Sequence, residues 1–420
     1  MAINIIPKNP MVSMGCSSSD KRYGQFTMST SSARGSRPRD RKAQLAAVAA
    51  ELFRARGFHG VGINDIAASA GVTGPALYRH FADKQAILAY VVLAGIDDME
   101  SATAAALADS APPPEQLNAL LTGLATQAVE RREIAALWRW EGPHLPREQR
   151  REIRRRSGAV LDAWTKALLT LRPELSADDA ELLCWAALSV FGSVAVHHTT
   201  VARKRFVPLL VELARTVLDV SLPVPEEPAP PVASSLGTPS RREQVLTAAT
   251  GLFAERGFHT VSMEDIGAAA GIAGPSVYRH FPSKAALMVA IGHRAADRLA
   301  LAAEQALQAP DERSALGRLA ASYVHVLLRT PELLVSFTAD RATMPERDKA
   351  DLRRVQRDYV DQWVSLLCAV FPELPAREAK IRVHAALTIA NDLSRTGRIK
   401  NRPHLQAELT TVLHAVLGLG

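Results

Sequence analysis

The sequence predicts an all-α protein made of two tandem units. Hydrophobic residues make up 47% of the 420 residues but aromatic residues only 5%, and Ala and Leu are abundant among the apolar positions. Ala and Leu favour helices, whereas strands need runs of Val, Ile, Thr and Tyr between turns, and such runs are scarce. The chain is also longer than the usual domain of about 150 residues, so more than one core is expected.

An internal repeat divides the chain into its two units. The segments that begin at Leu52 and at Ala70 return, with few changes and in the same register, about two hundred positions later. Weaker matches continue through the rest of the unit, where Trp164 corresponds to Trp363. This shared spacing indicates that a whole unit was duplicated.

Each unit begins with three helical segments. Apolar residues at helical spacing predict an amphipathic helix that stops at Gly57, and the same pattern stops at Gly257 in the second unit. A short second helix follows, and Gly71 or Gly271 supplies the turn into a short third helix. Two short helices joined by a tight turn predict a helix-turn-helix, with the recognition helix last.

The remaining boundaries follow from composition. Residues 1–38 are basic, Ser-rich and aperiodic, so they are expected to be a disordered tail, either a functional arm or an over-extended gene start. Residues 221–239 are Pro-rich and predict an extended linker that lets the units pack side by side. The expected domains are therefore a helix-turn-helix domain (39–86), a regulatory helical domain (87–220), a second helix-turn-helix domain (240–286) and a second regulatory domain (287–420).

Charge, cysteine and hydropathy patterns narrow the class of protein. The net charge is +7, but nearly all of the excess lies at or before Lys42, so nucleic-acid affinity of the folded part must come from local placement of charge. The three cysteines lie far apart without Cys-x-x-Cys spacing, which argues against a zinc site or a disulfide framework. No apolar run approaches the roughly 20 residues of a spanning helix, so a cytoplasmic protein that does not use a membrane is expected.

The helix-turn-helix residues resemble the signature of the TetR family. The resemblance rests on residues 57–58, 65–67, 70–73, 77–81 and Lys84, and the second unit matches equally well through Lys284. It implies two tandem TetR-like units, each with an N-terminal three-helix DNA-binding domain and a variable helical domain for ligand binding and dimerisation. TetR-like proteins generally act as homodimers with recognition helices about 34 to 36 Å apart. This chain is therefore expected to bind double-stranded DNA as an intramolecular pseudo-dimer.

The recognition helix of each unit has the residues that contact with the major groove requires. Small residues at its start allow close backbone approach, and the free N–H groups there suit phosphate. Arg79 is the strongest candidate for a hydrogen bond to a guanine edge, and Pro75 is a candidate for contact with a thymine methyl group. Thr73 is expected to cap the helix and to reach a phosphate.

By resemblance, Tyr78, His80 and Lys84 face the DNA backbone and fix the register of binding. The alternative for the two ring side chains is simple packing at the edge of the helix. The full set of residues expected to contact DNA is Arg41, Lys42, Thr73, Gly74, Pro75, Ala76, Tyr78, Arg79, His80 and Lys84 in the first unit, and Arg241, Arg242, Ala273, Gly274, Pro275, Ser276, Tyr278, Arg279, His280 and Lys284 in the second.

The two motifs depart from the family pattern at different places. Before the second helix, the first unit has Gly62 where the second has Ser262, which is set to form a capping box. Before the recognition helix, Ala273 replaces Thr73, so a cap and a phosphate contact are expected to be lost. Ser276 also changes a base-facing position. Unequal half-sites and a non-palindromic operator are therefore expected.

The pseudo-dimer is expected to use the last two helices of each unit. Residues 182–201 with 206–220, and residues 380–392 with 403–419, are expected to form an uneven four-helix interface. The rival arrangement is a dimer of chains that carries four helix-turn-helix motifs.

The middle of each unit is expected to hold an effector pocket. An aromatic lining would suit a small hydrophobic effector, although aromatic residues at helical spacing more often belong to the core. No cofactor is expected. The candidate lining residues are Trp138, Trp164, Trp185 and Trp363.

Two polar features have simpler explanations than a site. His197 and His198 are adjacent on a predicted helix, point different ways, and are expected to be packing or surface residues rather than metal or ligand contacts. The arginine-rich run at 147–156 contains interspersed acids and is expected to be a solvated helix face rather than a second nucleic-acid surface.

Two rival function classes are disfavoured. The sequence has no Walker loop, no Gly-x-Ser-x-Gly elbow, no metal-ligand cluster and no dinucleotide fingerprint, so it does not predict an enzyme. Decay into an interaction protein is disfavoured because the second unit keeps Tyr278, Arg279, His280 and Lys284. The expected function is a sequence-specific transcriptional regulator, with repression relieved by a ligand as the expected mode.

Overall fold

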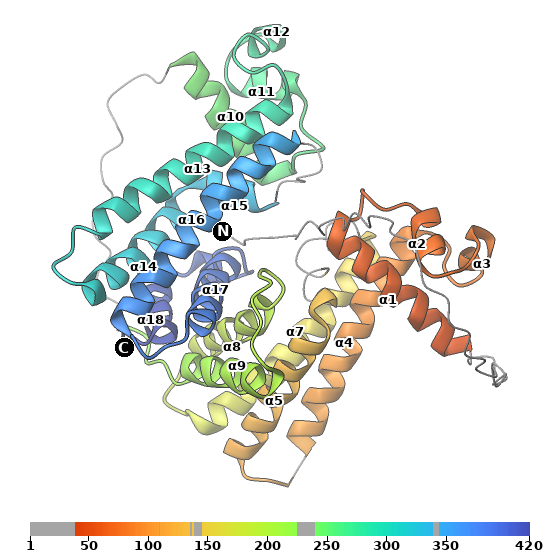
Figure 1. The fold of residues 1–420 in the computed structure, drawn as a ribbon, viewed down its shortest axis with the longest axis vertical. Helices are drawn as coiled ribbons and strands as arrows, with labels where there is room; N and C mark the ends of the chain where they lie inside the picture. Colours follow the sequence, from red (N-terminus) through yellow and green to blue (C-terminus); the bar gives the residue numbers. More distant parts are fainter. Residues whose placement is uncertain (1–37, 109, 135–136, 138–144, 225–239, 339–343) are drawn as a thin grey trace, which may run out of the picture.

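The structure, a computed structural model, describes residues 38–108, 110–134, 137, 145–224, 240–338 and 344–420. Within these ranges the regular structure is helical throughout, and no strand is present, which confirms the predicted all-α class (Figure 1). The expected tail, apart from its last residue, and most of the expected linker lie outside the described residues. Among the described helices, none combines the length and the apolarity that a bilayer-spanning segment needs.

Within the described residues, the first unit starts with three helices around a small core and continues with five more helices. Its helices are α1 (Pro38–Arg56), α2 (Ile63–Ser69), α3 (Gly74–Tyr78), α4 (Lys84–Ala108), α5 (Pro113–Glu130), α7 (Arg147–Leu171), α8 (Ala177–Ser193) and α9 (Arg203–Leu218). Helix α4 contacts α1 near its start and both α5 and α7 further along, so it joins the two parts of the unit.

The second unit repeats this order. Its helices are α10 (Arg241–Arg256), α11 (Met263–Ala269), α12 (Gly274–Val277), α13 (Lys284–Ala306), α14 (Glu312–Arg329), α15 (Pro331–Thr338), α16 (Glu346–Val370), α17 (Ala376–Leu393), the short 3₁₀ helix η3 (Ile399–Asn401) and α18 (Leu405–Leu417). Helices α5 and α14 have the same length, as do α7 and α16, which shows that the duplication extends beyond the first three helices.

Each group of three short helices has its own core. In the first unit, Phe53, Ile66 and Leu77 come from α1, α2 and α3 and pack with Ile87 of α4, all with almost no exposed surface. The second unit builds the equivalent cluster from Phe253, Ile266, Val277 and Leu287. These residues are the apolar positions of the amphipathic pattern, so the pattern alone dictates which face of each helix turns inward.

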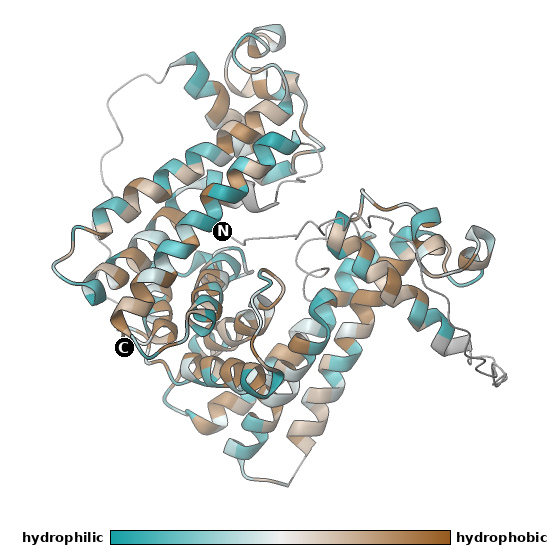
Figure 2. Cartoon of the chain, viewed as in Figure 1, coloured by the Kyte–Doolittle hydropathy of each residue, from teal (hydrophilic) through white to brown (hydrophobic). Residues whose placement is uncertain are grey.

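The regulatory parts of the two units share one hydrophobic core. Helix α8 packs along α17, and α9 contacts α18, so residues far apart in the sequence form one continuous cluster (Figure 1). The hydrophobic residues gather along these helices where the two units meet (Figure 2). Fully buried small residues, among them Ala186, Ala187, Ala385 and Ala386, allow the two helix backbones to come close.

Ion pairs lie around this contact between the units. Arg205 of α9 donates to both carboxylate oxygens of Glu378 of α17, at 2.8 and 2.6 Å, and this guanidinium lowers the pKa of the Glu378 carboxyl. Arg402, just before α18, bonds to both Asp179 and Glu408. Partly exposed pairs of this kind fix the alignment of two surfaces more than they add stability.

The end of α8 differs from the sequence prediction. The predicted helix ran through residue 201, but α8 ends at Ser193, and residues 197–202 are not helical. The Ser193 hydroxyl donates to the Val190 carbonyl at 2.6 Å, and β-branched Val194 and Val196 follow. A hydroxyl that binds a nearby carbonyl competes with the helical ladder, and β-branched residues support it weakly. His197 and His198 therefore lie in a connecting segment and not on a helix.

Candidate nucleic-acid interface and ligand cavity

The turn between α2 and α3 depends on a backbone conformation that glycine adopts readily. Gly71 has a φ of 64°, in the left-handed region, and the Val72 N–H donates to the Ala67 carbonyl at 2.9 Å. The second unit repeats both features at Gly271, with a φ of 66°, and at Ile272. The turn before α3 and the turn before α12 therefore have the same backbone conformation.

One face of each recognition helix is anchored and the other is open. Leu77 and Val277 are buried in the helix-turn-helix cores, whereas Tyr78 is 56% exposed and Tyr278 is 48% exposed. Thr73, Pro75 and Arg79 are also exposed, and so are Ala273, Pro275 and Arg279; His280 is exposed and His80 is half-buried. Gly74, Ala76, Gly274 and Ser276 are half-buried near the helix starts. The open face carries one guanidinium, one phenol and one imidazole per unit, which are groups that bind phosphates and base edges.

The recognition arginines differ in their surroundings. The Arg279 guanidinium donates to the Ser276 hydroxyl at 2.9 Å, so the second unit holds this side chain against its own helix. The first unit has Ala76 at the matching position, and within the described residues Arg79 has no comparable hydrogen bond. The exposed faces of α3 and α12 are therefore unlike in geometry as well as in sequence.

Lys84 and Lys284, at the starts of α4 and α13, were expected to face the DNA backbone, but their ammonium groups bind carbonyls of the protein itself. Lys84 Nζ donates to the carbonyls of Phe58 and Val61 at 2.7 and 2.9 Å and lies 4.2 Å from the centroid of the Phe58 ring. Lys284 repeats this arrangement on the equivalent carbonyls of the second unit. Each ammonium group thus ties the loop after the first helix to the start of the fourth helix.

The basic residues at the starts of α1 and α10 divide into two kinds. Lys42 lies over the rings of Phe81 and Tyr90, 5.1 and 5.0 Å from their centroids, and Arg242 lies 4.7 Å from the centroid of Phe281. These cations stabilise the end of the recognition segment by cation–π contact. Arg41 and Arg241 instead bond to glutamine side chains on the exposed face of their own helices.

The expected difference in caps is only partly present. Ser262 accepts from the Asp265 N–H at 3.0 Å and completes the predicted capping box. In the first unit, the Gly62 N–H donates to Asp65 at 2.7 Å, so half of the box remains. The expectation that Thr73 caps α3 is wrong, because its side chain makes no cap hydrogen bond, as Ala273 cannot either. Pro75 and Pro275 stabilise the first turns of these helices instead, because proline has the helical φ built in.

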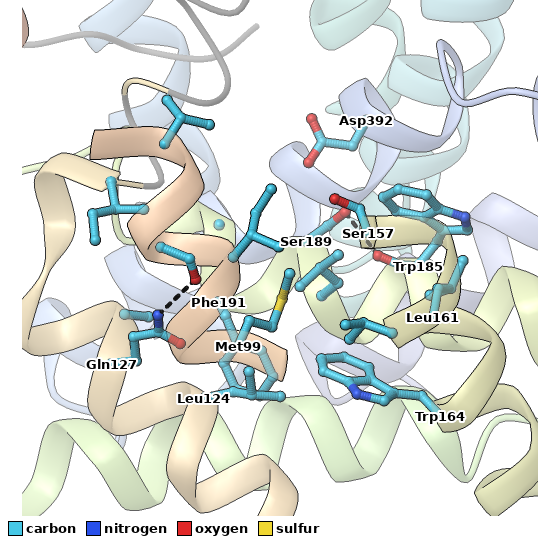
Figure 3. A pocket seen from close by; sticks show the side chains of 18 of the residues that line it. Met99, Leu124, Gln127, Ser157, Leu161, Trp164, Trp185, Ser189, Phe191 and Asp392 are labelled. Carbon is cyan, nitrogen blue, oxygen red and sulfur yellow. Dashed lines mark hydrogen bonds between the residues drawn. The ribbon is translucent and has the colours of Figure 1, made fainter. Parts of the chain in front are cut away.

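A cavity of about 410 Å³ lies in the regulatory part of the first unit. Met99 of α4, Leu124 of α5, Trp164 of α7 and Trp185 of α8 form its apolar wall (Figure 3). Asp392, Arg395 and Thr396, which belong to the second unit, also line it. Figure 3 shows Asp392 at the end near Ser157 and Ser189, away from Leu124 and Trp164. The cavity is therefore apolar along its body and polar at the end where the second unit closes it.

Of the four tryptophans that were expected to line an effector pocket, two line the cavity. Trp164 and Trp185 line the cavity, and the Trp164 indole N–H donates to Thr103 at 2.9 Å. The expectation that Trp363 lines a pocket is wrong, because this side chain has no exposed surface and packs with Tyr323 and Tyr359 in a filled core. Trp138 lies outside the described residues.

The sequence prediction missed most of the cavity. Its lining comes from α4, α5, α7, α8 and the end of α17, and no local motif marks these positions. The one available signal was the repeat itself. A position-by-position comparison of the two sequences shows where a large residue in one unit corresponds to a small residue in the other.

Two buried histidines meet where the units join. The rings of His197 and His384 stack with centroids 4.7 Å apart, and both side chains are buried. Burial lowers the pKa of His384 to about 3, and burial, with His384 beside it, lowers the pKa of His197 well below its usual range. Both rings are neutral at physiological pH. This agrees with the expected packing role of His197, and His198 is exposed on the surface.

The arginine-rich start of α7 bonds to acidic residues. Arg155 pairs with Glu152 on the same helix, as the prediction of a solvated face requires. Arg156 instead reaches Asp97 and Glu100 of α4, and these carboxylates raise its pKa. Within the described ranges, no cluster of three or more His, Cys, Asp or Glu side chains is placed to hold a metal ion.

Comparison with known proteins gives the same assignment for both helix-turn-helix segments. The sequence model of the bacterial regulatory proteins of the tetR family matches the chain twice, at residues 45–91 and 245–291. The chain is 36% identical over 101 residues to the HTH-type transcriptional activator FasR of Mycolicibacterium smegmatis, covering 24% of this chain and 46% of that protein. It is 42% identical over 59 residues to the HTH-type transcriptional repressor KstR2 of Rhodococcus jostii, covering 14% and 29%.

These curated relatives are matched over less than half of their own length. Among solved structures, a TetR-family transcriptional regulator from Bordetella parapertussis is 19% identical with a TM-score of 0.38, over 41% of this chain and 93% of that one. The two matches of the family model coincide with the two helix-turn-helix cores described above. The chain therefore carries two TetR-type units in one polypeptide, each of which matches the bacterial regulatory proteins of the tetR family over its helix-turn-helix domain.

Proposed function

We propose that the chain is a sequence-specific, DNA-binding transcriptional regulator in which the two units act together as an intramolecular pseudo-dimer on one non-palindromic operator. The observation that carries this proposal is the shared core: α8 and α9 of the first unit pack on α17 and α18 of the second. A dimer interface made within the chain needs no second copy.

Contact between equivalent residues also supports the pseudo-dimer. His59 and His259 occupy the same position after the first helix of each unit, and their rings lie 5.9 Å apart. In a two-fold arrangement, a residue can meet its own equivalent only close to the axis. The contact therefore supports a two-fold relation between the units, in which the axis would pass between the helix-turn-helix domains as well as between α8 and α17.

We propose that the open faces of α3 and α12 read the two half-sites. Arg79 and Arg279 are the base-reading residues, while Tyr78, Tyr278 and the neighbouring histidines bind phosphates. Their exposure supports these roles, and Thr73, Pro75 and Pro275 extend the same faces. The bond from Arg279 to Ser276 is the physical basis for unequal half-sites.

The regulated step is proposed to be release of DNA when a small hydrophobic effector fills the cavity of the first unit. Helix α4 supports this coupling, because Lys84 at its start is bound to the loop after α1, while Ile96 and Met99 further along line the cavity. A ligand that shifts α4 would move the first recognition helix relative to the second. The two named relatives include an activator and a repressor, and we propose repression here.

Operator binding of two variants tests the DNA-binding proposal. The operator is first selected from random duplexes with the full-length protein, and footprinting then gives its two halves. We expect Arg79→Ala to relax base preference in one half and Arg279→Ala in the other, each at a cost of about 1 to 3 kcal/mol. Unchanged affinity and preference in both variants would favour an interaction protein with decayed motifs.

A further inference from the structure

We infer that each chain binds one ligand, not two: an apolar molecule with a single acidic head group, held in the cavity of the first unit and contacted at its head by the second unit. This inference rests on the proposed ligand response and names its site, its number per chain and its ligand class. It follows from comparing the two units position by position.

Three small or medium residues of the first unit leave the cavity open. Leu124, Val160 and Gly192 all line it, from α5, α7 and α8. Trp164 forms part of the same wall, and its indole N–H is already bound to Thr103, so the ring is held in place. The lining residues at these positions present methyl groups or backbone to the space.

The same positions of the second unit carry larger side chains. In α14, α16 and α17, Tyr323, Tyr359 and Asn391 stand where the first unit has Leu124, Val160 and Gly192. Tyr323 is fully buried, its hydroxyl donates to Asn391 at 3.0 Å, and its ring packs edge-on against Trp363 with centroids 5.9 Å apart. These side chains occupy the space that is empty in the first unit.

The contact between the units also leaves space on the first unit's side and none at the equivalent position on the second unit's side. On the first unit's side, Trp185 and Thr396 both line the open cavity. The corresponding pair on the other side is His384 and His197, whose stacked, buried rings close the gap. Among the residues that the structure describes, the second unit therefore fills the space and closes the entrance that stay open in the first unit.

The polar end of the cavity selects the head group. Arg395 donates through Nε to the Asn391 carbonyl at 2.8 Å and pairs with Asp392 at 3.4 Å, so a ligand carboxylate has to replace Asp392, which also lines the cavity, at this guanidinium. A ligand carboxylate that bonds to this guanidinium would make a shorter, charge-assisted contact. Ser157 and Ser189 lie at the same end, but their hydroxyls donate to the carbonyls of Ile153 and Trp185, so the ligand carboxylate is bound through Arg395. The apolar wall along Met99 and Leu161 suits a hydrocarbon body.

Isothermal titration with decanoate and with decanol tests the number of sites and the head group. We expect the full-length protein to bind one decanoate per chain, and decanol at least tenfold more weakly. Arg395→Gln should weaken decanoate to the level of decanol. Arg398→Gln is the matched control, because Arg398 lies nearby but pairs with Glu181 outside the cavity, and it should leave both affinities unchanged.

Exchanging the residues between units tests the cavity itself. The double variant Leu124→Tyr with Val160→Tyr should lose decanoate binding. The reciprocal variant Tyr323→Leu with Tyr359→Val should still bind one decanoate per chain, because His384 and His197 keep the entrance closed. Circular dichroism and operator binding report whether each variant is folded. The inference is overturned by two sites in the unmodified protein, by decanoate binding that survives filling the first cavity, or by an operator-binding protein that binds neither probe. Ligand binding without operator binding would overturn the proposed function instead.

Discussion

At the scale of single residues, the two lysines that follow the recognition segments act mainly inside the protein. Lys84 and Lys284 each bind two loop carbonyls and lie over a phenylalanine ring, in the same geometry in both units. The duplicated chain kept this arrangement, although the family resemblance suggested a role at the DNA backbone. Hydrogen bonds from a charged donor to partly buried carbonyls are worth more than ordinary ones.

We therefore expect Lys84→Met to destabilise the protein. The side chain keeps its length but loses both hydrogen bonds and leaves two carbonyls without their partner, so the free energy of unfolding should fall by about 2 kcal/mol. Urea denaturation followed by circular dichroism measures this. Lys204→Met, at an exposed position, is the control and should change stability by less than about 0.5 kcal/mol. Equal stability of the two variants would contradict an internal role.

The buried histidine pair makes stability depend on pH. Burial lowers the pKa of His384 to about 3 in the folded protein, against 6.5 in an exposed histidine, and His197 shifts the same way. The unfolded chain therefore binds protons that the folded chain excludes. Stability is complete above pH 6.5 and is lost as the pH falls toward 3, by about 1.4 kcal/mol per pH unit for each histidine.

His384→Gln should flatten this dependence. We expect the slope of unfolding free energy against pH, measured between pH 6 and pH 4 by denaturant titration, to fall by up to about 1.4 kcal/mol per unit. His325→Gln, at an exposed position of α14, should keep the original slope. A slope that is the same in both variants would show that the stacked rings are not held neutral.

At the scale of elements, the helices that precede the two turns differ by one capping side chain. Ser262 caps α11 through its hydroxyl, whereas Gly62 leaves α2 with only the reciprocal bond from Asp65. A Cβ added at Gly62 would approach only the Asp65 carboxylate, at 3.2 Å, and the φ of −92° suits any residue. The first unit can therefore accept the cap that the second already has.

Exchanging the caps should change stability in opposite directions. We expect Gly62→Ser to raise the free energy of unfolding by about 1 kcal/mol and Ser262→Ala to lower it by a similar amount. Thr73→Ala should have little effect on stability, because Thr73 makes no cap hydrogen bond. Thermal unfolding followed by calorimetry reports all three, and a large loss in Thr73→Ala would restore the capping role that the sequence suggested.

The sequence predicted elements well where one local pattern decides them. Apolar spacing and turn glycines fixed the three helices of each helix-turn-helix, because every signal for Gly71 or Leu77 lies within a few residues. The sequence did not predict features that depend on packing between helices far apart in the chain. Trp363 fits an effector cavity as well as Trp164 does by local pattern, and only the tyrosines that other helices bring beside it make it a core residue.

At the scale of the whole molecule, the two units of the duplicated chain are packed differently, and we propose that they have different tasks. The first keeps an open cavity, and the second fills its own with Tyr323 and Tyr359 and contributes Arg395 to its neighbour. A homodimer cannot divide roles in this way, since each substitution would appear in both subunits. The unlike recognition helices, with Ala76 in one and Ser276 in the other, are expected to extend the same asymmetry to DNA.

The central claim is that one chain supplies both halves of the DNA-binding unit. Multi-angle light scattering of the full-length protein, alone and bound to a duplex that contains one selected operator, tests it most directly. We expect the mass of a single chain in free solution and of one chain per duplex in the complex, over at least a tenfold range of protein concentration. A free dimer of chains, or a complex that contains two chains on one operator, would contradict the account.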